Sequence, residues 1–317
     1  MKKNCLFMLA VMLIAAACKR SEEITPSAPE ISSTGNATAV QNASLVPVIV
    51  AGSKDHAGYV NAAGGSARFN QPYGIFVNTD GTLLVADQRN GAVRKILNGV
   101  VSTVIKNTQL VGISSLAAVK DGTLALNDQG TTVLVKGGML NYISFPFCEH
   151  CNTGGLSKSA GGDFFWYVNN VYDGISGVSL EAIKPNGDPI NGIGGVVAES
   201  DSALVFGTSM STTLNDNKFI TTDKGIYEIT HSGALLNILT PSTFDGLTDI
   251  AANKDGTKLY LADKGDIKLV TRCTSCPTVL TVLATHVDAT ALALSNSEKV
   301  LFFTSAKHHT ISKINLP

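Results

Sequence analysis

The sequence predicts an all-β fold, a six-bladed β-propeller of four-stranded antiparallel blades. Three observations support this prediction: β-branched and apolar runs recur at a nearly constant spacing, a turn sequence precedes each run, and the two ends of the chain complement each other. A constant spacing is the signature of a repeat architecture, and units of about 41 residues are typical of propeller blades.

The spacing is clearest at the residue that ends the second strand of each predicted blade. Successive positions are separated by 41, 41, 54, 40 and 42 residues, so one insertion of about 13 residues, between Lys184 and Asp216, explains the irregular interval. A hairpin turn such as Asp80-Gly81 lies seven or eight residues before each position. The six positions are Asp87, Asp128, Asn169, Asp223, Asp263 and Ser305.

Residues 67–105 show the sequence pattern of one complete blade most clearly. Runs at 74–77, 82–86, 92–96 and 100–105 are joined by short turns, which predicts a four-stranded meander. The motifs FNQPYGI, VAD, RKI and GVVST within this stretch resemble those of an NHL repeat. The resemblance implies a propeller, and the motifs are weaker in the other repeats.

The two ends of the chain predict how the ring closes. Residues 310–316 read as the third strand of the sixth blade, and the sequence then ends without a fourth strand. Residues 45–51 (LVPVIVA) match the composition of an outermost strand. We therefore expect the propeller domain to span residues 45–317, with an N-terminal strand completing the last blade and leaving no bare edge.

The N-terminal segment predicts where the protein is located in the cell. A basic start, an apolar run and three small residues occupy positions 1–17 and precede Cys18, which resembles the signal peptide of a bacterial lipoprotein. The resemblance implies that Cys18 is lipidated. Residues 18–44 are rich in Ser, Thr, Pro, Ala and Asn, so we expect a disordered tether. An acidic cluster just after Cys18 resembles the surface-export signal of Bacteroidetes lipoproteins. These features predict a lipid-anchored protein of the bacterial cell envelope, at the outer membrane, facing either the periplasm or the outside.

The charge balance limits the class of partner. The formal net charge is −1, and only 15% of residues are charged. A nearly neutral chain lacks the basic footprint of a nucleic-acid-binding protein. We expect a monomer that contacts the membrane only through its lipid anchor.

Propeller topology predicts where polar side chains gather. The loops from each outer strand to the next blade, and from second to third strand, share one face, which we call the first face; the other hairpins form the second face. Asp249 aligns with Gly74 and Ser115 at the start of an innermost strand, which places a carboxylate at the mouth of the central channel. The candidate binding residues are Asp249, Asp87, Arg89, Asn90, Asp128, Asn169, Asp223, Asp263, His308 and His309.

A structural interpretation competes with ligand binding at these positions, because aspartates at strand ends commonly cap the next turn. The pairs Cys148/Cys151 and Cys273/Cys276 fall on opposite faces, so two local disulfides explain them better than a shared zinc site. A zinc site made by His56, His286 and His308 or His309 is an alternative. No cofactor is predicted, although calcium or zinc would be needed by a metal-dependent enzyme.

Two functions remain open from the sequence. The first is an envelope-anchored binding module for a protein, peptide or glycan, because no recognisable catalytic constellation is present. The alternative is a metal-dependent propeller enzyme, a lactonase-like hydrolase or a lyase, with its site at the channel mouth, where Asp249, Asn169 and Asp223 could supply oxygen ligands. The resemblance to six-bladed rings implies both uses, and no catalytic residue is predicted.

Overall fold

The computed structural model describes residues 41–42, 45–143, 151–171, 176–190, 195–200, 207–222, 225–239, 244, 246–273 and 277–317. Within these residues the chain forms six sheets, the blades, each with four antiparallel strands. One blade carries an additional short strand, β1 (Gln41–Asn42), parallel to its outer strand. The predicted six-bladed propeller is confirmed, and the described helical structure is limited to two single turns, η1 (Gly64–Ser66) and η2 (Gln88–Asn90).

The blades follow one another along the chain, from inner to outer strand. Blade 1 holds β3 (Pro72–Val77), β4 (Leu83–Asp87), β5 (Ala92–Leu97) and β6 (Val100–Lys106). Blade 2 holds β7 (Ile113–Ala118), β8 (Leu124–Asp128), β9 (Thr131–Lys136) and β10 (Met139–Tyr142). Blade 3 holds β11 (Cys151–Lys158), β12 (Phe165–Val171), β13 (Ser176–Ile183) and β14 (Gly195–Ser200).

The second half of the ring is built in the same way. Blade 4 holds β15 (Gly207–Thr212), β16 (Lys218–Thr222), β17 (Gly225–Ile229) and β18 (Leu235–Leu239). Blade 5 holds β19 (Leu247–Ala252), β20 (Lys258–Asp263), β21 (Gly265–Thr271) and β22 (Val279–Ala289). Blade 6 holds β23 (Ala291–Leu294), β24 (Val300–Ser305), β25 (Thr310–Asn315) and, as its outer strand, β2 (Val48–Gly52).

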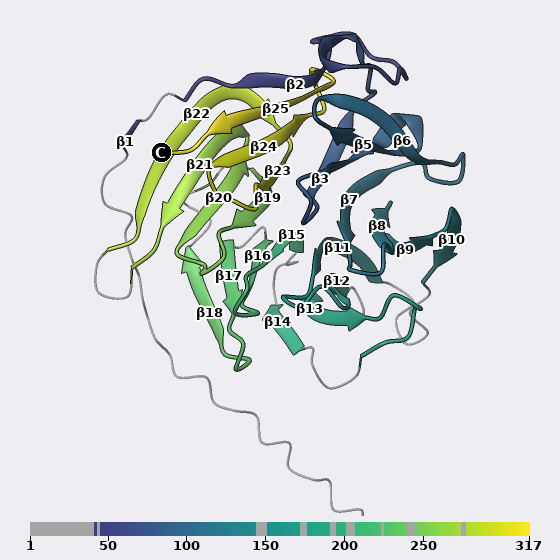
Figure 1. Cartoon of the computed structure of the whole chain (residues 1–317). Helices are drawn as coiled ribbons and strands as arrows, with labels where there is room; N and C mark the ends of the chain where they lie inside the picture. Colours follow the sequence, from purple (N-terminus) through teal and green to yellow (C-terminus); the bar gives the residue numbers. More distant parts are fainter. Residues whose placement is uncertain are drawn as a thin grey trace, which may run out of the picture. The chain divides into compact units, whose positions relative to one another are not determined.

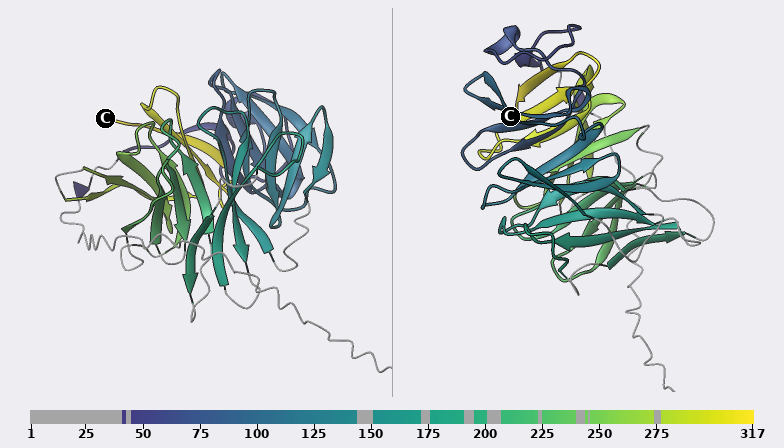
Figure 2. Two further views of the ribbon diagram at one scale, coloured as in Figure 1. Left: turned by 90° about the horizontal axis from the view of Figure 1, so that it is seen from below. Right: turned by 90° about the vertical axis from the view of Figure 1, so that its right-hand side faces the viewer.

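The six inner strands surround the centre of the ring. Each contacts the inner strand of the next blade, in the order β3, β7, β11, β15, β19 and β23, and β23 contacts β3 again (Figure 1). Seen from the side, the strands of the blades cross from one face of the ring to the other (Figure 2). The inner strands therefore form the wall of a central channel.

The ring closes as the sequence predicted. β2 pairs antiparallel with β25, with Val48 opposite Lys313 and Gly52 opposite Thr310. The last blade thus takes three strands from the C-terminal end and one from the N-terminal segment. This pairing satisfies the backbone groups along the outer side of β25, which would otherwise be an open sheet edge.

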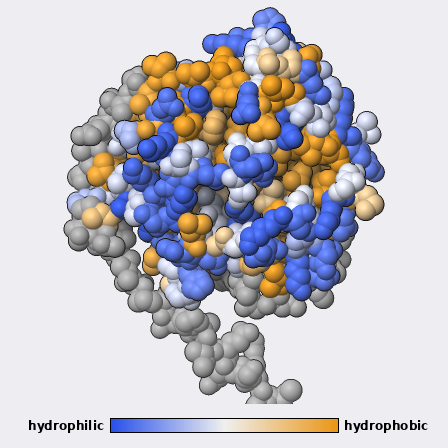
Figure 3. Space-filling model, in the orientation of Figure 1, coloured by the Kyte–Doolittle hydropathy of each residue, from blue (hydrophilic) through white to orange (hydrophobic). Residues whose placement is uncertain are grey.

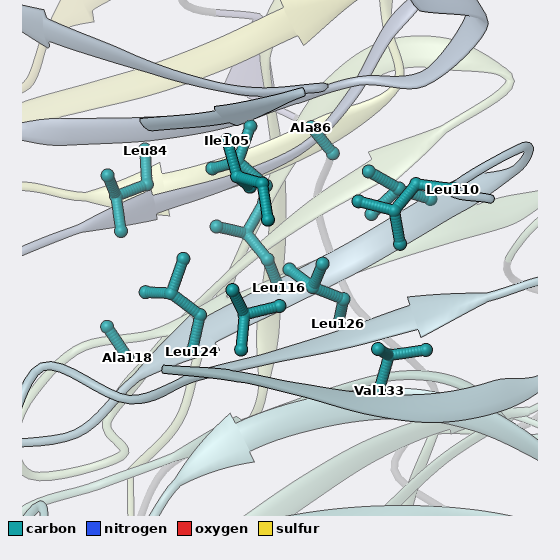
Figure 4. Packing of buried hydrophobic residues seen from close by; sticks show 12 residues of the cluster. Leu84, Ala86, Ile105, Leu110, Leu116, Ala118, Leu124, Leu126 and Val133 are labelled. Atoms are coloured by element: carbon teal, nitrogen blue, oxygen red, sulfur yellow. The ribbon is translucent and has the colours of Figure 1, made fainter. Parts of the chain in front are cut away.

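Neighbouring blades are held together by apolar side chains between them. One cluster joins blades 1 and 2 and includes Leu84, Ile105, Leu116 and Leu126 (Figure 4). The second strands β4, β8 and β16 are buried at every position, because each is covered by a blade on both sides. This double burial explains why apolar residues follow one another in β4 (LLVAD) and at the start of β8 (LALND) instead of alternating with polar ones.

Apolar side chains are also exposed on part of the surface. In Figure 3, hydrophilic residues surround the centre of the ring, and hydrophobic residues lie mainly over blades 6, 1 and 2. Exposed large side chains there include Val46, Val48, Val100 and Met139. None of the helical turns in the described part of the chain has the length and hydropathy of a membrane-spanning segment.

Candidate functional site

The central channel holds a cavity lined by polar groups, with a volume of about 430 Å³. This volume falls within the range of roughly 300–1,000 Å³ of small-molecule sites. Hydroxyl side chains from several inner strands line it, and few of the lining side chains are charged. The serine and threonine residues that line it are Ser114, Ser115, Ser157, Thr208, Ser209, Ser211, Thr212, Thr248 and Ser295.

Irregular backbone near the first face shapes the channel. In five of the six blades the register between inner and second strand shifts near the start of the inner strand, for example between Leu247 and Asp249 in blade 5. Bulges of this kind redirect the side chains that follow them and are frequent beside functional sites. They turn small polar residues toward the channel where a regular strand would alternate its side chains.

Glycines allow the inner strands to approach closely. A Cβ atom on Gly155 of β11 would lie 2.5 Å from the backbone N of Met210 in β15. One on Gly74 of β3 would lie 2.8 Å from the Cα of Ser115 in β7. Side chains larger than hydrogen are thus excluded at these two places, which keeps the channel narrow and its wall continuous.

Asp249 is the carboxylate near the first-face end of this channel. It pairs opposite Ala262, just as Ser115 pairs opposite Asn127 and Ser209 opposite Thr221, so the predicted alignment with Ser115 is correct. The equivalent positions of the other blades described above therefore carry small side chains. Asp249 is consequently the one charged group at this level among the described inner strands.

The carboxylate of Asp249 joins three blades. Its Oδ1 accepts a hydrogen bond from Ser209 Oγ of blade 4, and its Oδ2 accepts one of 2.6 Å from the backbone N of Leu292 in blade 6. Burial raises the pKa of Asp249 from 3.8 to about 6, and the hydrogen bonds from Ser209, Leu292 N and Ile250 N oppose that rise. Asp249 can therefore take up and release a proton near neutral pH, as a general acid or base must.

Lys158 stands at the other end of the channel. It is the last residue of β11, half-buried, and lies with its Nζ 5.7 Å from the centroid of the Phe76 ring in blade 1. Burial, and then the charge of Lys120, lower the pKa of Lys158. No sequence pattern singles out this residue, because a lysine at the end of a strand is usually solvated.

Three predicted blade-end aspartates are buried and bonded inside the fold. Asp87 forms an ion pair with Arg94 at 2.7 Å and also accepts the backbone N of Asn70. Asp128 accepts the backbone N of Gly112 at 2.6 Å, and Asp263 forms an ion pair with Lys268. Asp87 and Asp128 accept backbone N–H groups from the segment before their own inner strand, and Asp87 also accepts the side chain of Asn90 in the turn that follows. Ligand binding by these carboxylates stays a prediction that this geometry does not favour.

The neighbouring polar candidates lie outside the channel lining. Arg89 is exposed and donates from Nε to Gln71 Oε1 at 2.8 Å. Asn90 donates to the carbonyl of Gly58 and to Asp87. Asn169 donates to Glu181 at 3.1 Å, whereas its buried Oδ1 has no hydrogen-bond partner in the described structure. Asp223 lies outside the described residues.

The two histidines of blade 6 hold the closure region together. His308 lies between Asp55, at 2.5 Å from Nδ1, and Asp288, at 2.8 Å from Nε2. His309 Nδ1 accepts the backbone N of Gln71 at 3.0 Å. These bonds connect blade 6 with the segment after β2, with blade 5 and with blade 1. Their direct role in the structure is to fasten these neighbouring segments.

The cysteines lie where the topology predicted, as far as they are described. Cys151 begins β11 on the first-face side, and Cys273 follows β21 in the hairpin to β22 on the second-face side. Cys273 is disulfide-bonded. Cys18, Cys148 and Cys276 lie outside the described residues, so the predicted pairing and lipidation stay predictions.

Comparison with known proteins finds likeness in structure alone. No protein-family model matches the chain, and no curated protein matches it in sequence. A virginiamycin B lyase from Staphylococcus aureus is 15% identical, with a TM-score of 0.57 over 81% of this chain and 98% of that one. A gluconolactonase from Xanthomonas campestris is 14% identical, with a TM-score of 0.60 over 86% and 89%. A calcium-binding regucalcin from Agrobacterium tumefaciens is 8% identical, with a TM-score of 0.60 over 88% and 96%.

These likenesses define the class of the protein. It is a six-bladed β-propeller whose structural neighbours are of the gluconolactonase and virginiamycin B lyase type. At such low identity they establish the fold, and the functional residues have to be argued from the channel itself.

The calcium-binding neighbour calls for a test of the channel as a metal site. Calcium takes six to eight oxygen ligands, usually including several carboxylates. No group of three or more His, Cys, Asp or Glu side chains suited to a metal occurs within the described residues. Both oxygens of Asp249 already accept hydrogen bonds, and Asn127 uses its amide to bind the backbone of Thr153, Gly154 and Gly130. The described channel residues therefore show no calcium site, and calcium binding stays a prediction.

Proposed function

We propose that this protein is an enzyme that binds a small polar molecule in its central channel and uses Asp249 as a general acid–base group. One observation carries the proposal: the single carboxylate at its level of a hydroxyl-lined channel has a pKa raised to about 6. Perturbed carboxyl groups inside pockets are typical of catalytic sites. The enzymatic nature of the structural neighbours supports this choice over a binding module.

The chemistry that fits the channel is proton transfer next to a polarised carbonyl. In hydrolysis of a lactone or ester, ionised Asp249 would take a proton from the attacking water and return it to the departing alkoxide oxygen. The Ser209 hydroxyl and the Leu292 amide hold the carboxylate in place. An elimination, as a lyase performs, would use the same carboxylate to remove a proton from carbon.

The test is a screen of small lactones and esters with the wild-type protein and two carboxylate variants. Asp249→Asn should lower kcat/KM by at least about a hundredfold, because general base catalysis contributes on the order of 10²–10⁴. Asp163→Asn is the matched control, since Asp163 is an exposed carboxylate on a second-face turn. For the active protein, kcat/KM should rise with pH through a midpoint near 6. Full activity of Asp249→Asn would refute the proposal, and a complete lack of turnover would favour the binding-module function.

We further propose that the propeller is tethered to the bacterial envelope through Cys18. The support is the sequence pattern of residues 1–44. Labelling of expressing cells with a radioactive fatty acid should mark the wild-type protein and leave Cys18→Ala unlabelled. Equal labelling of both proteins, or of neither, would remove this anchor, and fractionation of the labelled protein would identify its membrane.

A further inference from the structure

Lys158 is a cation in the channel wall with an unusual environment. β11 lies between β7 and β15, and Lys158 ends it at the second face (Figure 1). Asp249 instead lies in the first half of β19. The channel therefore has a carboxylate toward one end and an ammonium group toward the other, on inner strands of different blades.

The ammonium group of Lys158 has no hydrogen bond or ion pair with any described residue. Nearby lysines differ: Lys254 Nζ donates to the carbonyl of Asn296 at 2.6 Å, and Lys120 Nζ lies 3.3 Å from Asp163. Glu298 also lines the channel, but it belongs to blade 6, across the ring from blade 3, and accepts the backbone N of Lys254 at 2.6 Å. Half-burial without a counter-charge is costly for a lysine, so a bound anion would relieve it.

A second group next to Lys158 also lacks a partner. Thr212 ends β15, the inner strand adjacent to β11, and lines the same channel. Its buried Oγ1 has no hydrogen-bond partner among the described residues. A hydroxyl rotates freely and can donate, so Thr212 and Lys158 together supply two donors at neighbouring strand ends.

We propose that Lys158 and Thr212 bind the anionic group of the channel's ligand, a carboxylate or a phosphate. This inference rests on the proposed function and narrows its substrate class to small polar anions. Lys158 would hold the charged end near the second face, which leaves the uncharged, reacting part of the molecule directed toward Asp249. Charge-assisted hydrogen bonds of this kind fix orientation as well as adding affinity.

The experiment measures anion affinity directly, without turnover. Inorganic phosphate and acetate are titrated separately into the isotopically labelled protein at pH 7, and amide chemical shifts of the inner strands are followed. Lys158→Gln should weaken binding of the preferred anion at least about tenfold, whereas Lys158→Arg should keep it within about threefold. Lys136→Gln is the matched control, because Lys136 is exposed and lies outside the channel lining; it should change affinity less than about twofold.

The outcomes separate this inference from the proposed function. Thermal melts establish that each variant is folded before its affinity is compared. Equal affinity of Lys158→Gln and wild-type protein, or no binding of either anion to the wild type, would overturn the inference. Asp249→Asn should still bind the anion. Retained binding together with unchanged turnover in Asp249→Asn would leave the anion site standing while removing the catalytic role of Asp249.

Discussion

Replacing Asp249 by asparagine should make the protein more stable at neutral pH while removing the proposed activity. The variant preserves the local bonding pattern, because an asparagine oxygen can accept the Leu292 N–H and its amide can donate to Ser209 Oγ. What changes is the charge: above pH 6 the wild-type protein holds an ionised carboxylate at a half-buried position, and Asp249→Asn does not. A stability cost at a functional carboxylate is a common trade-off.

The magnitude and its sign follow from the pKa. The carboxyl has its ordinary pKa of 3.8 in the unfolded chain and about 6 in the folded protein. Between these two values the folded state binds more protons, so the free energy of unfolding falls as pH rises through this window. The full difference is about 3 kcal/mol, since each pKa unit corresponds to ~1.4 kcal/mol. The stabilisation of the folded state by protonation of Asp249 is present below pH 4 and lost above pH 6.

Urea unfolding at several pH values provides the assay. The unfolding free energy of Asp249→Asn minus that of the wild type should increase by about 2.5 kcal/mol from pH 4 to pH 7.5 and stay constant at higher pH. Asp163→Asn should show no comparable trend, because Asp163 is exposed. A difference that is independent of pH, or one that decreases toward neutral pH, would refute the reasoning that burial raises the pKa of Asp249.

Three further changes test the packing. Arg94→Met should lower the free energy of unfolding by about 3–5 kcal/mol, because it leaves buried Asp87 without its cationic partner. Lys136→Met, at an exposed ion pair, should lower it by less than about 1 kcal/mol. Similar Tm shifts for both variants would contradict this expectation. Gly155→Ala should lower Tm, because the added methyl group clashes with the backbone of β15. Gly65→Ala should leave Tm unchanged, because the nearest atom to its methyl group would be 3.9 Å away. Equal Tm values for the two variants would show that β11 and β15 can move apart. A variant lacking residues 1–44 should unfold cooperatively in calorimetry. A variant lacking residues 1–52 also loses β2, so it should aggregate or melt over a broad temperature range. Identical melting curves would mean that the pairing of β2 with β25 is dispensable.

Local sequence features were sufficient to predict the blades. Asp80-Gly81 illustrates this: Gly81 has a φ of 82°, and Asp80 Oδ1 accepts the backbone N of Thr82, as a hairpin turn of these residues requires. Second strands end at Asp87, Asp128, Asp263 and Ser305 as predicted. In blade 3 the strand runs to Val171, two residues beyond Asn169. Turn residues and β-branched runs act over a few neighbours, so they can be recognised along the chain.

The sequence by itself thus determined the six repeats, the closing strand and the position of Asp249 at the start of an inner strand. Only the tertiary structure decided which polar side chains remain available. Asp87 pairs with Arg94 inside its own blade, whereas Lys158, in the channel wall, has no hydrogen bond or ion pair among the described residues. The physical reason is that a partner's position depends on how blades pack around the ring. Contacts between strands far apart in sequence set the burial, the hydrogen bonds and hence the pKa of each group.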